Sequence, residues 1–213
     1  MKVKFVTFGC SRNKADTELM MGFCNHEIVE SGQDVTVVNT CFVKKHTEKR
    51  VLNYLNSLSG HVVVTGCLAQ ARPELIEAFP THSFLGVRAL NRINEAIESQ
   101  VIDLNERSLD FSQKKSFNQL ISITPISHGC LGSCTYCCTK QARGTLRSIP
   151  INQVINQVKT DLRNGAREVW LTGQDTGCYG LDINSSLPEL LKQVTSLRGD
   201  FRVRVGMMNP AYA

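Results

Sequence analysis

The chain has 213 residues, of which 42% are hydrophobic and 20% charged, with a net charge of +5 and nine cysteines. This composition is that of a globular protein long enough for one large or two small domains, and it argues against a disordered chain. The sequence has neither the apolar run of a membrane span nor that of a secretory signal peptide, so we expect a cytoplasmic protein.

The number of cysteines indicates what kind of chemistry to expect from them. Their number is odd and no export signal precedes them, so metal binding or redox chemistry is favoured over disulfides. The mild positive charge permits an RNA partner without requiring one.

The first half of the chain alternates apolar strands with helices. This alternation is typical of a parallel sheet covered on both faces. It predicts an α/β domain over residues 1–104 of the open parallel-sheet (Rossmann or flavodoxin) type. Asp16 is expected to cap the first helix. The expected strands cover 2–8, 27–29, 35–39, 61–65 and 82–85, and the later helices cover 44–58, 73–79 and 90–99.

Residues 105–118 are polar and charged without clear periodicity, which predicts a linker between domains. The alternating pattern then restarts, and residues 119–213 are expected to form the first part of a β/α partial barrel. The expected strands cover 120–126, 168–171 and 201–205, and the expected helices cover 150–164 and 187–196.

A loop of the second half, GCLGSCTYCC, contains Cys130, Cys134 and Cys137 at C-x3-C-x2-C spacing. Three thiolates suit a soft metal or an iron–sulfur centre, and three protein ligands leave one iron of a 4Fe–4S cluster open. S-adenosylmethionine (SAM) can chelate that iron, and this spacing followed by β/α units resembles the radical-SAM superfamily. Structural zinc is the alternative, but no second C-x2-C or His pair follows. Cys138 is expected to pack rather than to be a fourth ligand.

Three cysteines of the first half share one position relative to predicted strands. Cys10, Cys41 and Cys67 each follow a strand, and the carboxyl ends of parallel strands meet at one edge of the sheet, where ligands bind. For each of these cysteines considered alone, the favoured interpretation is a small buried residue with a packing role. Their common position predicts a second iron–sulfur cluster with three protein ligands. Cys24 and Cys178 do not share a position with other cysteines and are expected to be structural.

Two three-cysteine groups in this order resemble the methylthiotransferases, radical-SAM enzymes that insert a sulfur atom and methylate it. The resemblance rests on TFGCSRNKADTE, VVNTCFVKKHTEKR and VVVTGCLAQARPEL in the first half. In the second half, GCLGSCTYCCTKQARGTLRS, LTGQDTGCYG and RVRVGMMNP resemble the archaeal and eukaryotic branch. That branch modifies threonylcarbamoyladenosine next to the tRNA anticodon.

The resemblance implies two 4Fe–4S clusters and SAM as cofactors. By this resemblance, the SAM-cleaving cluster is bound by Cys130, Cys134 and Cys137, and the auxiliary cluster is bound by Cys10, Cys41 and Cys67. Tyr136 is expected to lie near the SAM adenine. The methionine end of SAM is expected to contact Gly173 and Gln174. A flexible loop is the alternative interpretation of residues 173–177.

The implied reaction converts N6-threonylcarbamoyladenosine to its 2-methylthio derivative, with the tRNA anticodon loop and an electron donor as partners. Phosphate contacts are expected from basic residues near the cysteines, with Arg143 and Arg147 favoured over Lys44, Lys45, Lys49, Arg50 and Lys140. The family's chains continue into the rest of the barrel and a small β domain, so the sequence is expected to be a fragment that alone binds tRNA weakly. The alternatives are a ribosomal-protein methylthiotransferase, a non-catalytic iron–sulfur electron carrier and a degenerate binding module without clusters.

Overall fold

The computed structural model describes residues 1–105 and 114–212. The chain forms two compact units, Met1–Lys115 and Ser116–Ala213. Of the predicted linker, residues 106–113 lie outside the described part of the chain. The two units are described separately below.

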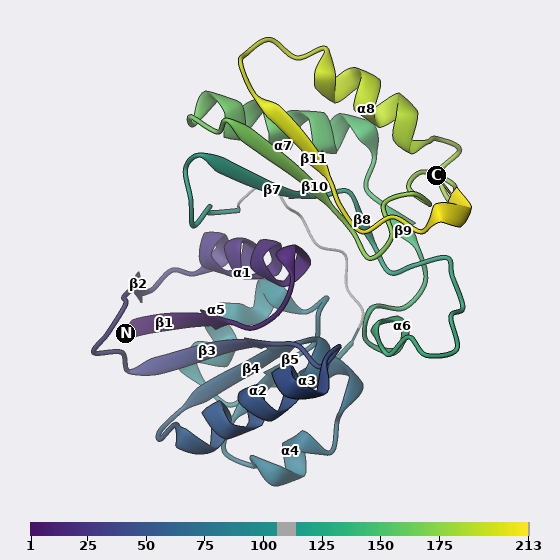
Figure 1. Cartoon of the computed structure of the whole chain (residues 1–213). Helices are drawn as coiled ribbons and strands as arrows, with labels where there is room; N and C mark the ends of the chain where they lie inside the picture. The colour runs from purple at the N-terminus through teal and green to yellow at the C-terminus, as the bar shows by residue number, and fades with distance from the viewer. Residues whose placement is uncertain (106–113, 213) are drawn as a thin grey trace. The chain divides into compact units, whose positions relative to one another are not determined.

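Unit 1 contains a parallel sheet whose strands are ordered β2-β1-β3-β4-β5-β6 (Figure 1). Its strands are β1 (Lys2–Thr7), β2 (Glu27–Ile28), β3 (Val35–Thr40), β4 (Val62–Gly66), β5 (Ser83–Leu85) and β6 (Ile102–Asp103). All pairs are parallel. The strand order reverses between β1 and β3, and in open α/β sheets such a switch point is where ligands bind.

Helices cover both faces of this sheet. They are α1 (Ser11–Phe23), α2 (Lys45–Ser57), α3 (Cys67–Ala71), α4 (Leu75–Ala78) and α5 (Ile93–Glu98), with a 3-10 turn, η1, over Leu90–Arg92. The main core joins α1 and α5 to the strands, through Leu19 and Met20 of α1 and Ile93 and Ile97 of α5. Figure 1 shows α2 and α3 on the opposite face.

The start of the first helix differs from the prediction. Helix α1 begins at Ser11, with Cys10 at its N-cap, so Asp16 lies within the helix and does not cap it. Asp16 is buried and its Oδ1 accepts a 2.5 Å hydrogen bond from Arg12 Nη1. The prediction relied on Asp16 as a typical capping residue, but this carboxylate pairs with Arg12 inside a helix that has already begun at Ser11.

Three further short elements of unit 1, described below, also depart from the prediction. Residues 67–71 form α3, which was not expected, and the helix expected over 73–79 is reduced to α4. Strand β6 was not predicted either, because two residues carry too little pattern to be recognised.

Unit 2 has a three-stranded parallel sheet ordered β11-β10-β7. Its strands are β7 (Ile121–Pro125), β10 (Glu168–Thr172) and β11 (Arg202–Val205). Helices α7 (Ile151–Arg163) and α8 (Leu187–Thr195) cover one face, and their apolar residues pack against Val169 and Leu171 of β10. This is the start of a β/α barrel, as predicted.

The cysteine loop of unit 2 lies between two very short strands. β8 (Ser127–His128) and β9 (Arg147–Ser148) pair antiparallel, and between them lie the loop and α6 (Thr139–Arg143). A 3-10 turn, η2, covers Pro210–Tyr212. No helix in the described part of the chain is long and apolar enough to cross a membrane.

Candidate functional sites

The structure brings the loops with Cys10, Cys41 and Cys67 to one end of three neighbouring strands. Thr7 of β1 pairs with Asn39 of β3, which pairs in turn with Thr65 of β4. Each cysteine follows two or three residues beyond this shared row. Adjacent strands lie about 4.8 Å apart. The three loops therefore border a common edge of the sheet at the switch point.

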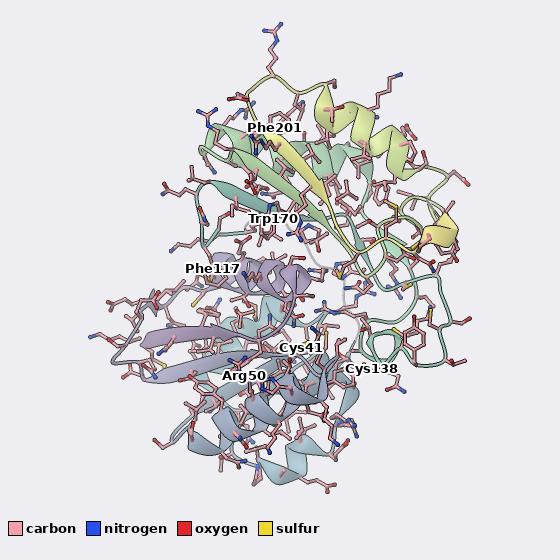
Figure 2. The ribbon with its side chains drawn as sticks, viewed as in Figure 1. Cys41, Arg50, Phe117, Cys138, Trp170 and Phe201 are labelled. Atoms are coloured by element: carbon pink, nitrogen blue, oxygen red, sulfur yellow. The ribbon has the colours of Figure 1, made fainter. Side chains whose placement is uncertain are left out.

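The local positions of these cysteines differ. Cys10 is exposed at the N-cap of α1, where the helix dipole favours negative charge. Cys41, labelled in Figure 2 just beyond β3, is 6% exposed, and Cys67 is 4% exposed as the first residue of α3. Cys10 Sγ lies 3.5 Å from Asn13 Oδ1.

Two glycines let these loops approach one another. Gly9 has a φ of +123°, and a Cβ there would lie 2.8 Å from Cys41 Cβ. Gly66 has a φ of +94°, and a Cβ there would overlap Asn39 Oδ1 and the backbone of Thr40. Only glycine fits at these two positions, and its absence of a side chain brings the cysteine loops close together.

The described side chains form no ready-made group of ligands for a single metal ion. Among the described residues, no group of three or more His, Cys, Asp or Glu side chains is close enough to hold one metal ion. A structural zinc ion needs such a tight group. In a 4Fe–4S cluster each cysteine binds a different iron, so its thiolates stand farther apart.

In unit 2, Cys130 and Cys134 face each other across Gly132. A Cβ on Gly132 would lie 3.5 Å from Cys130 Sγ and 3.9 Å from Cys134 Sγ. The Gly132 backbone N–H donates to Cys130 Sγ at 3.3 Å, and the Cys137 N–H donates to the Cys134 carbonyl at 3.0 Å. The loop therefore brings the Cys130 and Cys134 sulfurs to the same glycine and already provides one N–H donor to a cysteine sulfur.

The ends of this loop are also held by hydrogen bonds. The Cys130 N–H donates to the Gly144 carbonyl at 3.2 Å, and Lys140 Nζ donates to the Cys130 carbonyl. Cys138, labelled in Figure 2, is half-buried at the N-cap of α6. That Cys138 packs rather than acts as a fourth ligand stays a prediction.

Tyr136 is 88% exposed within the same loop. A hydrogen bond with the Cys134 thiol raises the pKa of Tyr136 above its usual value. The exposed ring leaves its faces open to solvent, and the contact with Cys134 ties its hydroxyl to the loop.

Unpartnered polar atoms gather where β7 and β10 end. Ser127 Oγ, Gln174 Oε1 and Asp175 Oδ2 are buried and have no hydrogen-bond partner among the described residues. A Cβ on Gly173 would lie 2.6 Å from Ser127 Oγ, so Ser127 adjoins the glycine loop. Buried polar atoms are rarely left unsatisfied, and a polar ligand would supply the missing partners.

Sequence reasoning missed Ser127 and Asp175. Asp175 Oδ1 accepts hydrogen bonds from the backbone N–H groups of Gly177 (3.1 Å) and Asn209 (3.0 Å), which fixes its carboxylate. The sequence offered one signal, since Asp175 follows Gln174 directly. Ser127 offered none, because its contact with Gly173 joins residues distant in the chain.

Cys178 lies next to the cysteine loop of unit 2. It is fully buried, and its thiol donates to the Asp175 carbonyl at 3.2 Å. Burial raises the pKa of Cys178, and a hydrogen bond from the Leu131 backbone partly opposes that shift. A buried, protonated thiol is a packing residue rather than a ready metal ligand.

The basic residues near the cysteines differ in how far their side chains are exposed to solvent. Arg50 lies on α2, labelled in Figure 2, with its guanidinium 5.8 Å from the centre of the Phe8 ring. Arg147 is exposed on β9, whereas Arg143 is 3% exposed. The expectation that Arg143 contacts RNA therefore disagrees with the structure, because a buried guanidinium offers no surface to a phosphate.

Two family models match the chain. Residues 2–86 match "Uncharacterized protein family UPF0004" and residues 124–208 match "Radical SAM superfamily". The two matches correspond to the two sheets and include both groups of three cysteines.

Curated relatives match the chain over nearly its whole length. The "Probable threonylcarbamoyladenosine tRNA methylthiotransferase" of Pyrococcus horikoshii is 40% identical over 99% of this chain and 53% of its own. The "Threonylcarbamoyladenosine tRNA methylthiotransferase" of Danio rerio is 35% identical over 99% of this chain and 43% of its own. The chain thus spans about half the length of the curated relatives it matches.

A solved structure is similar in fold. The radical S-adenosylmethionine methyltransferase TsrM from Kitasatospora setae matches with a TM-score of 0.54 and 14% identity, over 90% of this chain and 52% of that chain. This likeness concerns the fold alone. The two family models and the curated relatives show that the chain contains a UPF0004 domain and a radical-SAM domain, and that over nearly its whole length it is similar to archaeal and eukaryotic threonylcarbamoyladenosine tRNA methylthiotransferases.

Proposed function

We propose that the chain is the cluster-binding part of a tRNA methylthiotransferase that modifies threonylcarbamoyladenosine next to the anticodon. The observation that carries the proposal is the placement of two groups of three cysteines. One group borders the switch point of the unit 1 sheet, and the other lies in the loop between β8 and β9. The names of the relatives supply the substrate class.

The residues present fit iron–sulfur clusters and SAM. In unit 1, Cys10, Cys41 and Cys67 would hold the auxiliary cluster, and the buried Thr65 hydroxyl beside them has no hydrogen-bond partner within the described residues. When bound, the auxiliary cluster supplies sulfur, and the other cluster supplies the electron that cleaves SAM.

In unit 2, the described residues would hold the second cluster and orient SAM. Cys130, Cys134 and Cys137 would hold their cluster, while the Gly132 N–H donates to one of its sulfurs. At the ends of β7 and β10, the hydroxyl of Ser127 would donate to the amino-acid end of SAM and the amide oxygen of Gln174 would accept from it, because both atoms are buried and without a partner among the described residues. The exposed ring of Tyr136 offers a stacking surface to the adenine.

The substrate is a base in a single-stranded loop of tRNA. A base there is already partly unstacked, so it reaches a recessed site at low cost. The exposed arginines Arg50 and Arg147 are suited to phosphates, which position an RNA without specifying it.

The test is anaerobic reconstitution followed by iron and sulfide counting on the full chain. We expect about eight irons per chain, with roughly half lost in Cys10→Ala and in Cys130→Ala. Cys24→Ala is the matched control, because Cys24 is a half-buried cysteine of unit 1 at the opposite end of α1 from Cys10, and this variant should keep all the iron. Iron content unaffected by either ligand variant would contradict the proposal.

Binding of SAM separates an enzyme from an electron carrier. Equilibrium dialysis with the reconstituted chain should show SAM binding that is weakened in Gln174→Ala and lost in Cys130→Ala. A carrier needs no open iron, so a chain that holds both clusters but binds no SAM would favour that alternative.

A further inference from the structure

Two buried asparagines connect the loops that carry the unit 1 cysteines. Asn13 Nδ2 donates to Asn39 Oδ1 and to the Thr40 carbonyl, both at 3.0 Å. Asn39 Nδ2 donates to the Asn13 carbonyl at 2.8 Å and to Thr17 Oγ1 at 2.9 Å. Each asparagine is 1% exposed. Asn13 is on α1 after Cys10, and Asn39 is on β3 before Cys41, so these four bonds tie one cysteine loop to the other.

The hydrogen-bond partners fix the orientation of both amides. The Thr40 carbonyl can only accept, so Nδ2 of Asn13 must face it, which leaves Oδ1 of Asn13 towards Cys10 Sγ at 3.5 Å. The Asn13 carbonyl likewise can only accept, so Asn39 directs Nδ2 to it. Thr17 Oγ1 continues the network to Thr7 Oγ1, 2.8 Å away on β1.

The third cysteine loop meets the same network. Asn39 Oδ1 and the Thr40 backbone fill the space where Gly66 would carry a side chain, and Gly66 directly precedes Cys67. Thr40 Oγ1 donates to the Thr65 carbonyl at 2.5 Å and accepts from the Ala69 N–H of α3 at 3.3 Å. The pair of asparagines and Thr40 therefore contact the segments that carry all three cysteines.

We propose that Asn13 and Asn39 are positioning residues that set the spacing of Cys10, Cys41 and Cys67 for the auxiliary cluster, an inference that rests on the proposed function. Asn39 Oδ1 already accepts from Asn13 Nδ2 and Asn13 Oδ1 faces Cys10 Sγ, so both amide oxygens are engaged within the protein and act on the cysteines rather than on iron. Groups that orient metal ligands typically contribute about 10–100-fold to metal affinity. A merely structural role would instead lower stability without changing iron affinity.

Asn94 provides the matched control. Its Nδ2 donates to the Phe23 carbonyl at 2.8 Å, and its Oδ1 accepts from the Asn25 N–H at 2.9 Å. It thus joins two segments of the same unit by the same chemistry, but at the opposite end of α1 from Cys10.

The experiment uses the full chain carrying Cys130→Ala, so that only the auxiliary cluster forms. Asn13→Ala, Asn39→Asp and Asn94→Asp are reconstituted anaerobically, and the iron retained is measured against increasing concentrations of an iron chelator. Thermal unfolding of each variant is recorded in parallel. Asn13→Ala leaves both donations from Asn39 intact and keeps a good helix former on α1, so it should fold even where Asn39→Asp does not.

We expect the Cys130→Ala parent and its Asn94→Asp variant to hold about four irons, with equal chelator midpoints. In Asn13→Ala and in Asn39→Asp the midpoint should fall by about tenfold or more. A midpoint of Asn13→Ala equal to that of Asn94→Asp would overturn the inference while leaving the cluster in place. A parent chain that holds no iron would instead show that the auxiliary cluster itself is wrong, and the inference would fall with it.

Discussion

Gly66 lies at the point where β4 passes into α3 and the chain reaches Cys67. Its backbone, with φ +94° and ψ −167°, is in a region that is nearly exclusive to glycine. The atoms of Asn39 and Thr40 occupy the remaining space. Both conformation and packing therefore require glycine here.

We expect Gly66→Ala to lower the free energy of unfolding of unit 1 by more than the about 1–3 kcal/mol that the backbone conformation alone costs. Gly60 is the control, because it has a φ of +82° in the same unit but no atom within 4 Å of its potential Cβ. Urea unfolding of the two variants measures the difference. Equal losses would mean that the packing around Gly66 relaxes freely.

At the scale of elements, the segment from α4 to β5 contains a histidine that titrates. His82 is 6% exposed just before β5, and its ring stacks on Phe79 with centroids 5.4 Å apart. Burial lowers the pKa of His82 below its usual 6.5, and the nearby His61 lowers it further. The neutral ring is therefore the form that the folded unit favours.

The sign of the pH dependence follows from this shift. The unfolded chain binds a proton at His82 at a higher pH than the folded chain does, so the stability of unit 1 should fall as the pH drops through about 6.5. His82→Phe keeps a ring against Phe79 and should reduce this dependence, whereas His46→Gln, at an exposed position on α2, should not. Urea unfolding between about pH 7 and pH 5 checks it.

The elements differ in how well the sequence predicted them. Strands β3 and β4 were predicted closely because both are buried runs rich in valine. The start of α1 was missed because its buried face contains Arg12, Asn13 and Asp16 and so has no apolar stripe. Helix α3 was missed because it begins at once after a strand, with no linker to separate the two patterns.

The same contrast holds for the candidate sites. The position of each unit 1 cysteine could be predicted, since each depends only on where a strand ends. The contacts around them could not, because Asn13 and Asn39 are far apart in sequence and meet only when β1 and β3 pair. Likewise, the contact of Ser127 with Gly173 forms only when β7 and β10 pair.

At the scale of the whole molecule, each unit has its own core. Leu90 belongs to the core of unit 1 and Leu190 to that of unit 2, and both are at most 1% exposed. Separate cores permit separate unfolding transitions.

We therefore expect two calorimetric transitions that respond to different substitutions. Leu90→Ala and Leu190→Ala should each cost about 2–5 kcal/mol and lower the temperature of only one transition. The two variants serve as controls for each other, since they remove the same atoms from equally buried positions. A single transition lowered by both would show that the units unfold together.

The strand order of unit 1 has a consequence for synthesis on the ribosome. The first strand made, β1, ends in the interior of the sheet, between β2 and β3, and β4, β5 and β6 then add outwards in the order in which they are translated. Domains generally fold from the N-terminus as they emerge. Cys10, Cys41 and Cys67 have all been translated before β5, so the nascent chain carries the complete set of thiols before either its own sheet or unit 2 is finished.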